Sequence, residues 1–237
     1  MKKVVIIPTY NERENVARMT DKVMSLEGDF DLLYVDDGSP DGTASIIREK
    51  IAEYGERVHL IERSGKLGLG TAYIAGFKWA LERGYDEIFE MDCDFSHNPD
   101  DLLRLASRLE GGADVAVGSR YVSGMNVVNW PLSRILISYG ASLYVRMVTR
   151  MPIYDSTAGF VGYRAEVLRT MNLDKVQMIG YGFQIEMKYT AWRLGFKVVE
   201  ESIIFVDRVE GVSKMSSSIF GEAFFGVMKL PFRKIKK

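Results

Sequence analysis

The stretch EIFEMDCDFSHNPDDLLRLASRLE, Glu87 to Glu110, decides the fold class of this chain. It opens with a short apolar run that ends at Met91, passes through two aspartates and a Ser-His-Asn-Pro turn, and continues into helical spacing. A short apolar run bounded by turn residues predicts a buried strand, and the spacing after Pro99 predicts a helix ending near Leu109. The stretch therefore reads as one strand, one loop and one helix.

Units of the same kind occur on both sides of this stretch. Apolar runs at 4–9, 32–37, 58–64 and 114–119 alternate with predicted helices at 14–26, 41–54 and 70–83. Further along, strands at 160–164 and 197–208 flank a predicted helix near 183–194. This alternation predicts an α/β protein with a mostly parallel sheet and helices on both faces. In such sheets ligands bind at the carboxyl ends of the strands.

The composition limits the class of protein. The 237 residues suit one large domain or a domain with a short appendage, and a net charge of -1 gives no reason to expect a nucleic-acid partner. One cysteine excludes an internal disulfide framework and fits a reducing compartment. The apolar run near the N-terminus is too short for a signal peptide, and no run is long enough for a transmembrane helix.

Asp92 and Asp94 follow the apolar run of the opening stretch. If the strand continues through them, its alternation places both carboxylates on one side, where they repel unless a cation lies between them. Hard carboxylate oxygens suit Mg²⁺ or Mn²⁺, with water and a substrate diphosphate as the other ligands. The alternative is a pair of solvated carboxylates. His97 likewise has two possible roles: a further metal ligand, or a hydrogen-bonding residue of the turn.

Two further loops have the chemistry of a nucleotide site. Asp37, in YVDDGSPDGT, ends a predicted strand and can accept hydrogen bonds from a ribose or from a uracil or guanine edge. The glycines of RSGKLGLGTA do not follow the first strand, where a dinucleotide-binding fingerprint belongs, and the chain has no P-loop motif. We therefore exclude a dinucleotide-binding site of that kind and a P-loop nucleotide site. The backbone of these glycines can still approach a ligand closely, and Lys66 can meet a phosphate.

Basic residues occupy other predicted loops. Arg120, in GSRY, follows the fifth strand, and Arg208 and Lys214 lie in DRVEGVSKM. An arginine at a strand end can bind phosphate through two hydrogen bonds. For any one of these basic residues taken alone, a surface salt bridge is the simpler interpretation. Several such residues around an acidic metal site favour a substrate with several phosphates.

The second half carries two amphipathic segments. Residues 131–149 have apolar side chains at helical spacing, with Arg134 and Ser138 on another stripe, and residues 220–228 form a second apolar set before a basic tail. We expect both to contact a membrane: the first has too many polar groups to span a bilayer, and the second, with the tail, has the composition of a helix that lies on an anionic membrane. Packing of both stripes on the sheet is the alternative. We expect a catalytic domain over 1–215, with the amphipathic segment at 129–150, and a C-terminal amphipathic helix with its basic tail over 216–237.

Taken together, these pieces resemble the family 2 glycosyltransferases of GT-A fold, and within them the dolichol-phosphate or polyprenol-phosphate mannose synthases. The matching pieces run in the family's order over about residues 4–215: IPTYNERENV, VDDGSPDGT, GKLGLGTAYIAGF, MDCDFSHNP, GSRY, DSTAGFVGYR, GYGFQIEM and DRVEGVSKM. One departure concerns the metal, because Ser96 stands where some relatives have a glutamine ligand.

The resemblance implies a role for each matching position. The nucleotide pocket would be lined by Pro8, Tyr10 and Glu12, with Asp37 beside the nucleoside. The metal would be bound by Asp92 and Asp94. The acceptor phosphate would be met by Arg120 and Arg134 with Ser138 nearby, and the diphosphate would be clamped by Arg208 and Lys214.

The implied reaction transfers mannose from GDP-mannose to polyprenyl or dolichyl phosphate, with inversion and with Mg²⁺ or Mn²⁺. The acceptor places the protein on the cytoplasmic face of a membrane, held peripherally or by a separate anchoring partner. Three alternatives stay open: a UDP-glucose-dependent polyprenyl-phosphate glucosyltransferase, a transferase acting on a soluble sugar, and a non-catalytic nucleotide-sugar-binding membrane protein.

Overall fold

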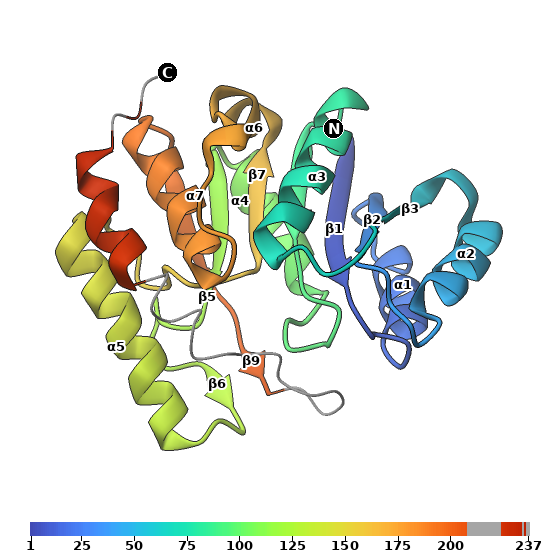
Figure 1. Cartoon of the computed structure of the whole chain (residues 1–237), viewed down its shortest axis with the longest axis horizontal. Helices are drawn as coiled ribbons and strands as arrows, with labels where there is room; N and C mark the ends of the chain where they lie inside the picture. Colours follow the sequence, from blue (N-terminus) through green and yellow to red (C-terminus); the bar gives the residue numbers. More distant parts are fainter. Residues whose placement is uncertain (208–223, 234, 236–237) are drawn as a thin grey trace.

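The computed structural model describes residues 1–207, 224–233 and 235 and contains a seven-stranded central sheet (Figure 1). The strands run in the order β3-β2-β1-β4-β7-β5-β8, and only β7 is antiparallel to its neighbours. Their bounds are β1 Lys3–Thr9, β2 Phe30–Asp36, β3 Val58–Glu62, β4 Glu87–Glu90, β5 Val115–Ser119, β7 Val161–Arg164 and β8 Val198–Ser202. The predicted mostly parallel α/β sheet is confirmed.

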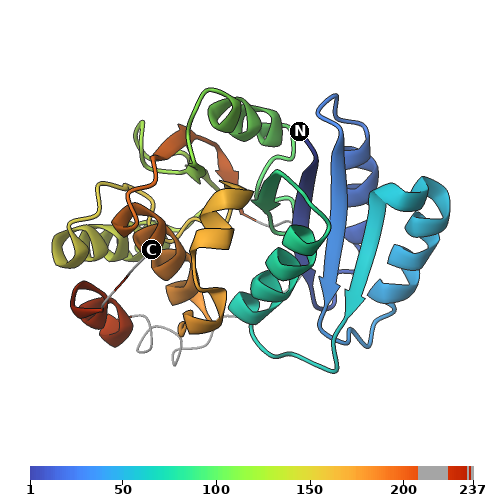
Figure 2. The ribbon, with the colours of Figure 1, turned by 90° about the horizontal axis from the view of Figure 1, so that it is seen from above.

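Helices cover both faces of the sheet (Figure 2). One face packs on α1 (Val16–Met24), α2 (Thr43–Tyr54) and α4 (Asp101–Glu110), and the other packs on α3 (Leu69–Glu82), α6 (Ala165–Thr170) and α7 (Tyr181–Arg193). The strands are buried on both sides, so alternate residues of β1 enter different cores. The four helices expected between 14 and 109 begin and end within two residues of their predicted bounds.

One predicted strand is divided in the structure, and another has a place in the sheet that the sequence does not predict. The expected strand over 197–208 divides into β8 and a short β9 (Phe205–Val206), and β9 pairs with β6 (Val127–Val128) in a separate two-stranded sheet. The strand predicted at 160–164 is β7, which lies between β4 and β5. It is therefore not a neighbour of β8, because β5 separates them.

The strand of the opening stretch is shorter than predicted. β4 ends at Glu90, and the residues from Met91 to Asn98 form an irregular loop in which Phe95 has a φ of 58°. The expectation that strand alternation directs Asp92 and Asp94 to the same side is therefore wrong. The loop, not a strand pleat, sets the direction of these two carboxylates.

The amphipathic segment forms α5 (Leu132–Thr149), which lies at the edge of the molecule beside α7 and the C-terminal helix (Figure 1). Of that C-terminal helix the structure describes residues 224–229, followed by a 3₁₀ turn at Leu230–Phe232. The predicted boundary at residue 215 lies outside the described residues. A small third core joins α5, α7 and the C-terminal helix through Val145, Ile185, Tyr189, Val227 and Leu230.

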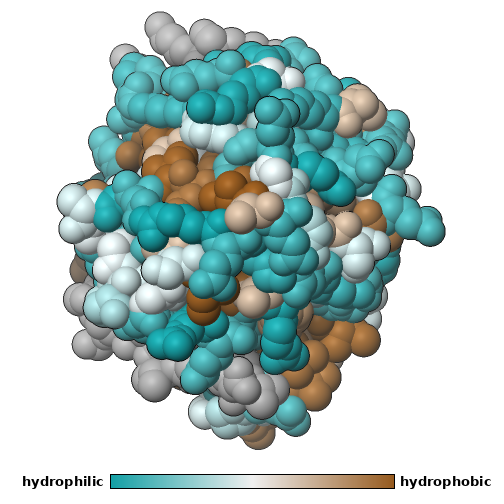
Figure 3. Space-filling model, turned by 90° about the vertical axis from the view of Figure 1, so that its right-hand side faces the viewer, coloured by the Kyte–Doolittle hydropathy of each residue, from teal (hydrophilic) through white to brown (hydrophobic). Residues whose placement is uncertain are grey.

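The apolar stripe of α5 points mostly outward. Leu132, Leu136, Leu143 and Met147 expose 70%, 60%, 44% and 66% of their surface, whereas Ser142 is buried. Packing of the stripe on the sheet is therefore not what the structure shows. At the opposite end of the molecule, hydrophilic residues cover most of the face around α2, with a few apolar patches between them (Figure 3). In the described part of the chain, no helix combines the length and apolarity needed to cross a membrane.

Candidate functional site

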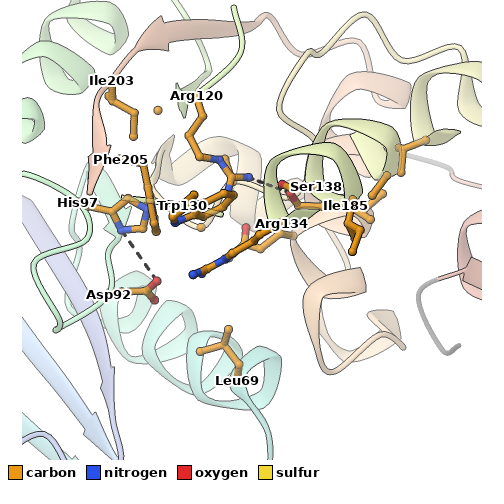
Figure 4. Close-up of a pocket in the computed structure, with 18 of the residues that line it drawn as sticks. Leu69, Asp92, His97, Arg120, Trp130, Arg134, Ser138, Ile185, Ile203 and Phe205 are labelled. Atoms are coloured by element: carbon orange, nitrogen blue, oxygen red, sulfur yellow. Dashed lines mark hydrogen bonds and ion pairs between the residues drawn. The ribbon is translucent and has the colours of Figure 1, made fainter. Parts of the chain in front are cut away.

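A cavity of about 790 Å³ opens at the carboxyl ends of β4 and β5 (Figure 4). It is lined by the loop after β4, the loop after β5, and side chains of α5, α7 and the C-terminal helix. The polar part contains five of the predicted site residues, namely Asp92, Asp94, Arg120, Arg134 and Ser138. The apolar part contains Ile137, Ala141, Tyr144, Val145, Ile185, Phe224 and Val227. One cavity therefore joins charged groups to an apolar section.

The two aspartates lie at the polar end of this cavity. The Asp92 side chain is 42% exposed, and the backbone N–H of Ser96 donates to Asp94 Oδ1 at 3.0 Å. Among the described residues, no group of three or more His, Cys, Asp or Glu side chains is arranged to hold a metal ion. Two carboxylates facing one cavity fit a hard cation whose remaining ligands are water and a diphosphate. Ser96 is buried.

His97 lines the same end of the cavity, packed against Phe160 and Phe205 with ring centroids 5.0 and 5.1 Å away. Its Nδ1 lies 3.9 Å from Asp92 Oδ2, which is longer than a hydrogen bond. Burial lowers the pKa of His97 to about 4, despite the nearby carboxylate of Asp94. The imidazole is therefore neutral at physiological pH.

Arg120 is held by a buried carboxylate. Its Nε donates to Asp155 Oδ2 at 2.7 Å, its Nη2 donates to Asp155 Oδ1 at 2.6 Å, and its backbone N–H donates to Oδ2 at 2.9 Å. Nη2 also donates to Thr157 Oγ1 at 2.9 Å. Burial alone raises the pKa of Asp155, but the charge and hydrogen bonds of Arg120 outweigh it, so the pKa lies below its ordinary value. Asp155 therefore stays ionised and orients Arg120.

Arg134 and Ser138 are four residues apart on α5, so both reach the cavity from one face of the helix. Arg134 Nη1 forms an ion pair with Asp207 Oδ1 at 2.9 Å. The Tyr121 hydroxyl donates to Ser138 Oγ at 2.8 Å. The loop after β5 and helix α5 thus support each other around the cavity.

The structure adds a buried polar chain beside the cavity that the sequence did not reveal. Gln184 lines the cavity, its Nε2 donates to Glu90 Oε2 at 2.7 Å, and Lys188 Nζ lies 3.4 Å from its Oε1. Lys188 Nζ also donates to the Ala158 carbonyl at 2.7 Å. Burial raises the pKa of Glu90 and lowers that of Lys188, with each partner opposing the shift of the other. The chain fixes the orientation of the Gln184 amide.

The residues predicted for the nucleotide lie at the ends of β1 and β2 and do not line this cavity. Asp37 is buried and accepts a hydrogen bond from Arg63 Nε at 2.6 Å. Lys66 Nζ lies 5.3 Å from the centre of the Tyr10 ring. Asn15 Nδ2 donates a hydrogen bond to Glu12 Oε2 at 3.0 Å, and Pro8 lies within β1. These groups share the carboxyl edge of the sheet with the two aspartates.

Several lining residues were missed, and two predicted ones cannot be placed. Arg208 and Lys214 lie outside the described residues. The missed lining residues include Trp130, Thr157, Gln184 and Phe205. Trp130 had a signal in the sequence, since it is a large aromatic residue directly before Pro131 and the predicted helix. The other three required the fold to bring distant segments together.

The sequence is similar to those of known glycosyltransferases. The sequence profile of glycosyl transferase family 2 matches residues 4–171. The polyprenol monophosphomannose synthase of Mycolicibacterium smegmatis is 47% identical over 97% of this chain and 87% of the relative. The undecaprenyl-phosphate mannosyltransferase of Micrococcus luteus is 46% identical over 97% of this chain and 93% of the relative. The dolichol-phosphate mannosyltransferase of Pyrococcus furiosus is 36% identical over 100% of this chain, which spans 64% of that relative.

Solved structures show the same fold. Glucosyl-3-phosphoglycerate synthase from Mycobacterium tuberculosis, in complex with Mn²⁺, UDP and glucosyl-3-phosphoglycerate, superposes with a TM-score of 0.68. It is 17% identical, and the superposition covers 97% of this chain and 78% of that one. The predicted GT-A fold is confirmed. The profile match and the relatives together show that the chain is a glycosyltransferase and belongs to glycosyl transferase family 2.

Proposed function

We propose that this chain transfers mannose from GDP-mannose to a polyprenyl or dolichyl phosphate, with inversion at the anomeric carbon and with a bound Mg²⁺ or Mn²⁺. One observation carries the proposal: a single cavity joins two carboxylates and two arginines to an apolar section between α5, α7 and the C-terminal helix. A polyprenyl phosphate has the same division into an anionic head and an apolar chain. The relatives named as mannosyltransferases for such lipids support this choice of acceptor and sugar.

On the donor side, Asp92 and Asp94 would hold the metal ion, which supplies positive charge against the departing diphosphate when it is bound. Lys66, Arg208 and Lys214 would add further positive charge. Pro8, Tyr10, Glu12 and Asp37 would bind the nucleoside at the ends of the neighbouring strands β1 and β2.

On the acceptor side, Arg120, Arg134 and Ser138 would hold the phosphate in line with the anomeric carbon. A phosphate nucleophile is already anionic at neutral pH, so the reaction needs no general base. The cavity fits this requirement, because His97 has a low pKa and Asp155 is paired with Arg120. Direct attack by the phosphate is a single displacement, which inverts the anomeric configuration.

The outward apolar side chains of α5 suit contact with a membrane that holds the acceptor. Burial of each in an apolar phase is favourable by about 1–2 kcal/mol. Phe224, Phe225 and Phe232 extend the same apolar character to the C-terminal helix and the turn after it, where they are exposed. These exposed side chains support peripheral attachment, and we propose the cytoplasmic face as its location and a separate anchoring partner as an addition.

A transfer assay tests the proposal. GDP-mannose and UDP-glucose, each labelled in the sugar, are offered separately with polyprenyl phosphate, with and without a chelator. We expect label in the organic-extractable lipid from GDP-mannose alone, and none after chelation. Label only from UDP-glucose would overturn the donor. No lipid product from either sugar would favour a soluble acceptor or a protein that binds nucleotide sugars without transferring them.

A further inference from the structure

The indole of Trp130 lies against both arginines of the cavity (Figure 4). The guanidinium carbon of Arg134 is 4.1 Å from the centre of the Trp130 ring, and that of Arg120 is 5.5 Å from it. Guanidinium groups stack on aromatic faces through cation–π attraction, which is stronger where water is excluded. A single side chain therefore contacts the two charged groups that approach the cavity from different segments, the loop after β5 and helix α5.

The backbone and a neighbouring ring hold this indole in place. Trp130 directly precedes Pro131, the N-cap of α5, and a proline restricts the residue before it to extended conformations. The Phe205 ring meets the indole edge-to-face at 5.3 Å and 71°. An indole packed in this way can act as a fixed support for the arginines.

The ring nitrogen points to a second role. Trp130 Nε1 is buried, and within residues 1–207, 224–233 and 235 it has no hydrogen-bond partner. An indole N–H is a donor only, and a buried donor without an acceptor is costly. Trp130 lines the cavity but Nε1 itself is closed to solvent, so a bound ligand can satisfy it with an oxygen acceptor once the groups that cover Nε1 shift slightly.

Both arginines of the cavity are already paired with carboxylates. Arg120 is paired with Asp155, and Arg134 is paired with Asp207. Because each guanidinium is already paired with a carboxylate, its charge is largely balanced. Binding of an anion here therefore depends on how the hydrogen-bond donors of the cavity are placed, and not only on net charge. A neutral N–H donor on the ring that contacts both guanidinium groups adds such placement without adding charge.

We propose that Trp130 is a binding and positioning residue for the acceptor phosphate: its indole face orients Arg120 and Arg134, and its Nε1–H donates to a phosphate oxygen. This inference rests on the proposed function, since it assigns a residue to the acceptor of that reaction. The two contributions are separable, because phenylalanine keeps an aromatic face and lacks the N–H donor.

Kinetics with polyprenyl phosphate and GDP-mannose test the assignment. We expect Trp130→Phe to raise the KM for the lipid about 10- to 100-fold, the value of one hydrogen bond to a charged group, with kcat within about threefold of wild type. Trp130→Leu removes the face as well and is expected to lower kcat too. Both variants should keep the KM for GDP-mannose within about threefold. The matched control is Trp79→Phe, because Trp79 also lies near an arginine, Arg83 at 4.2 Å, and does not line the cavity.

A spectroscopic readout follows the N–H itself. The chain has three tryptophans, so ¹⁵N labelling gives three indole signals, and Trp130→Phe identifies the one that disappears. Adding a short-chain polyprenyl phosphate should shift the Trp130 indole proton downfield and leave the other two signals in place.

Either of two results would overturn the inference while the proposed function stands: a lipid KM in Trp130→Phe equal to that of a wild type that transfers mannose normally, or equal losses for donor and lipid. An unmoved Trp130 signal with saturating lipid phosphate would do the same. A wild type that neither binds nor uses polyprenyl phosphate would overturn the proposed function and this inference together.

Discussion

Replacing Asp155 by asparagine is expected to destabilise the fold strongly, because Asp155 is the buried partner of Arg120. The Asp155 side chain is fully buried, the Arg120 side chain is 11% exposed, and three hydrogen bonds of 2.6–2.9 Å join the residues. Asparagine keeps the shape but removes the charge, and its amide group donates where Arg120 also donates. Breaking a buried pair by changing one partner costs about 3–5 kcal/mol.

The expected change in melting temperature follows from this cost. For a chain of this size, each kcal/mol lowers the melting temperature by about 2–4 °C, so Asp155→Asn should melt roughly 6–20 °C below wild type. The pKa of Asp155 lies below its ordinary value, so its contribution is complete at neutral pH. The difference between wild type and variant should shrink only as the pH falls below about 4.

Asp207→Asn is the matched control. It makes the same chemical change in the Arg134 pair, whose side chains are 34% and 27% exposed, and a solvent-exposed pair contributes about 0–1 kcal/mol. Calorimetry at pH 7 compares the melting temperatures of the two variants with that of wild type. If Asp155→Asn melted within about 3 °C of wild type, or no lower than Asp207→Asn, the assignment of Asp155 as the anchor of Arg120 would be wrong.

Three more predictions follow from other parts of the molecule. Asp94→Asn should lower the transfer rate about 10²- to 10³-fold at saturating substrates, and unchanged transfer with unchanged Mn²⁺ affinity would refute its role as a ligand. Gly162→Ala should lower the free energy of unfolding by about 1–3 kcal/mol in urea, because an added Cβ would lie 2.7 Å from the buried ring of Phe89; an unchanged midpoint would contradict this. Leu136→Gln with Met147→Gln should weaken binding to anionic vesicles roughly tenfold or more without lowering the melting temperature, since both side chains are mostly exposed, and equal binding would argue against this face of α5 as the membrane contact.

The sheet and the helices on both faces were predictable because they follow from local patterns. Apolar runs of strand length alternate with helical spacing, and the first four helices lie where that spacing places them. The antiparallel β7 was not predictable, because its place between β4 and β5 depends on pairing between residues more than 40 positions apart. No local pattern in FVGYR distinguishes one neighbour from another.

The polar end of the cavity was predictable in its membership but not in its geometry. Asp92, Asp94 and Arg120 follow strands whose carboxyl ends share one edge, which is why they converge. The direction of the two aspartates depends on the loop after Glu90, which the sequence suggested to be strand. The partners of Arg120 and Glu90 lie 35 and 94 residues away, so their contacts follow from the completed fold.

The helix at α5 was predictable from its periodicity, but its orientation on the protein was not. The spacing predicted a helix with an apolar stripe and a polar stripe, and both are present. It could not tell which stripe faces the protein. The structure turns Arg134 and Ser138 toward the cavity and leaves Leu132 and Leu136 exposed. This arrangement supports an acceptor that comes from a membrane.

The chemical structure of the product shows whether the acceptor phosphate attacks the anomeric carbon directly. GDP-mannose labelled with ¹³C at the anomeric carbon is incubated with polyprenyl phosphate, a divalent metal and the protein, and the lipid extract is examined by ¹³C and ³¹P NMR. We expect a β-mannosyl phosphate, with the label coupled to phosphorus and its configuration inverted. An α-linked product, or labelled mannose released into water, would contradict a phosphate nucleophile that attacks the anomeric carbon in a single displacement.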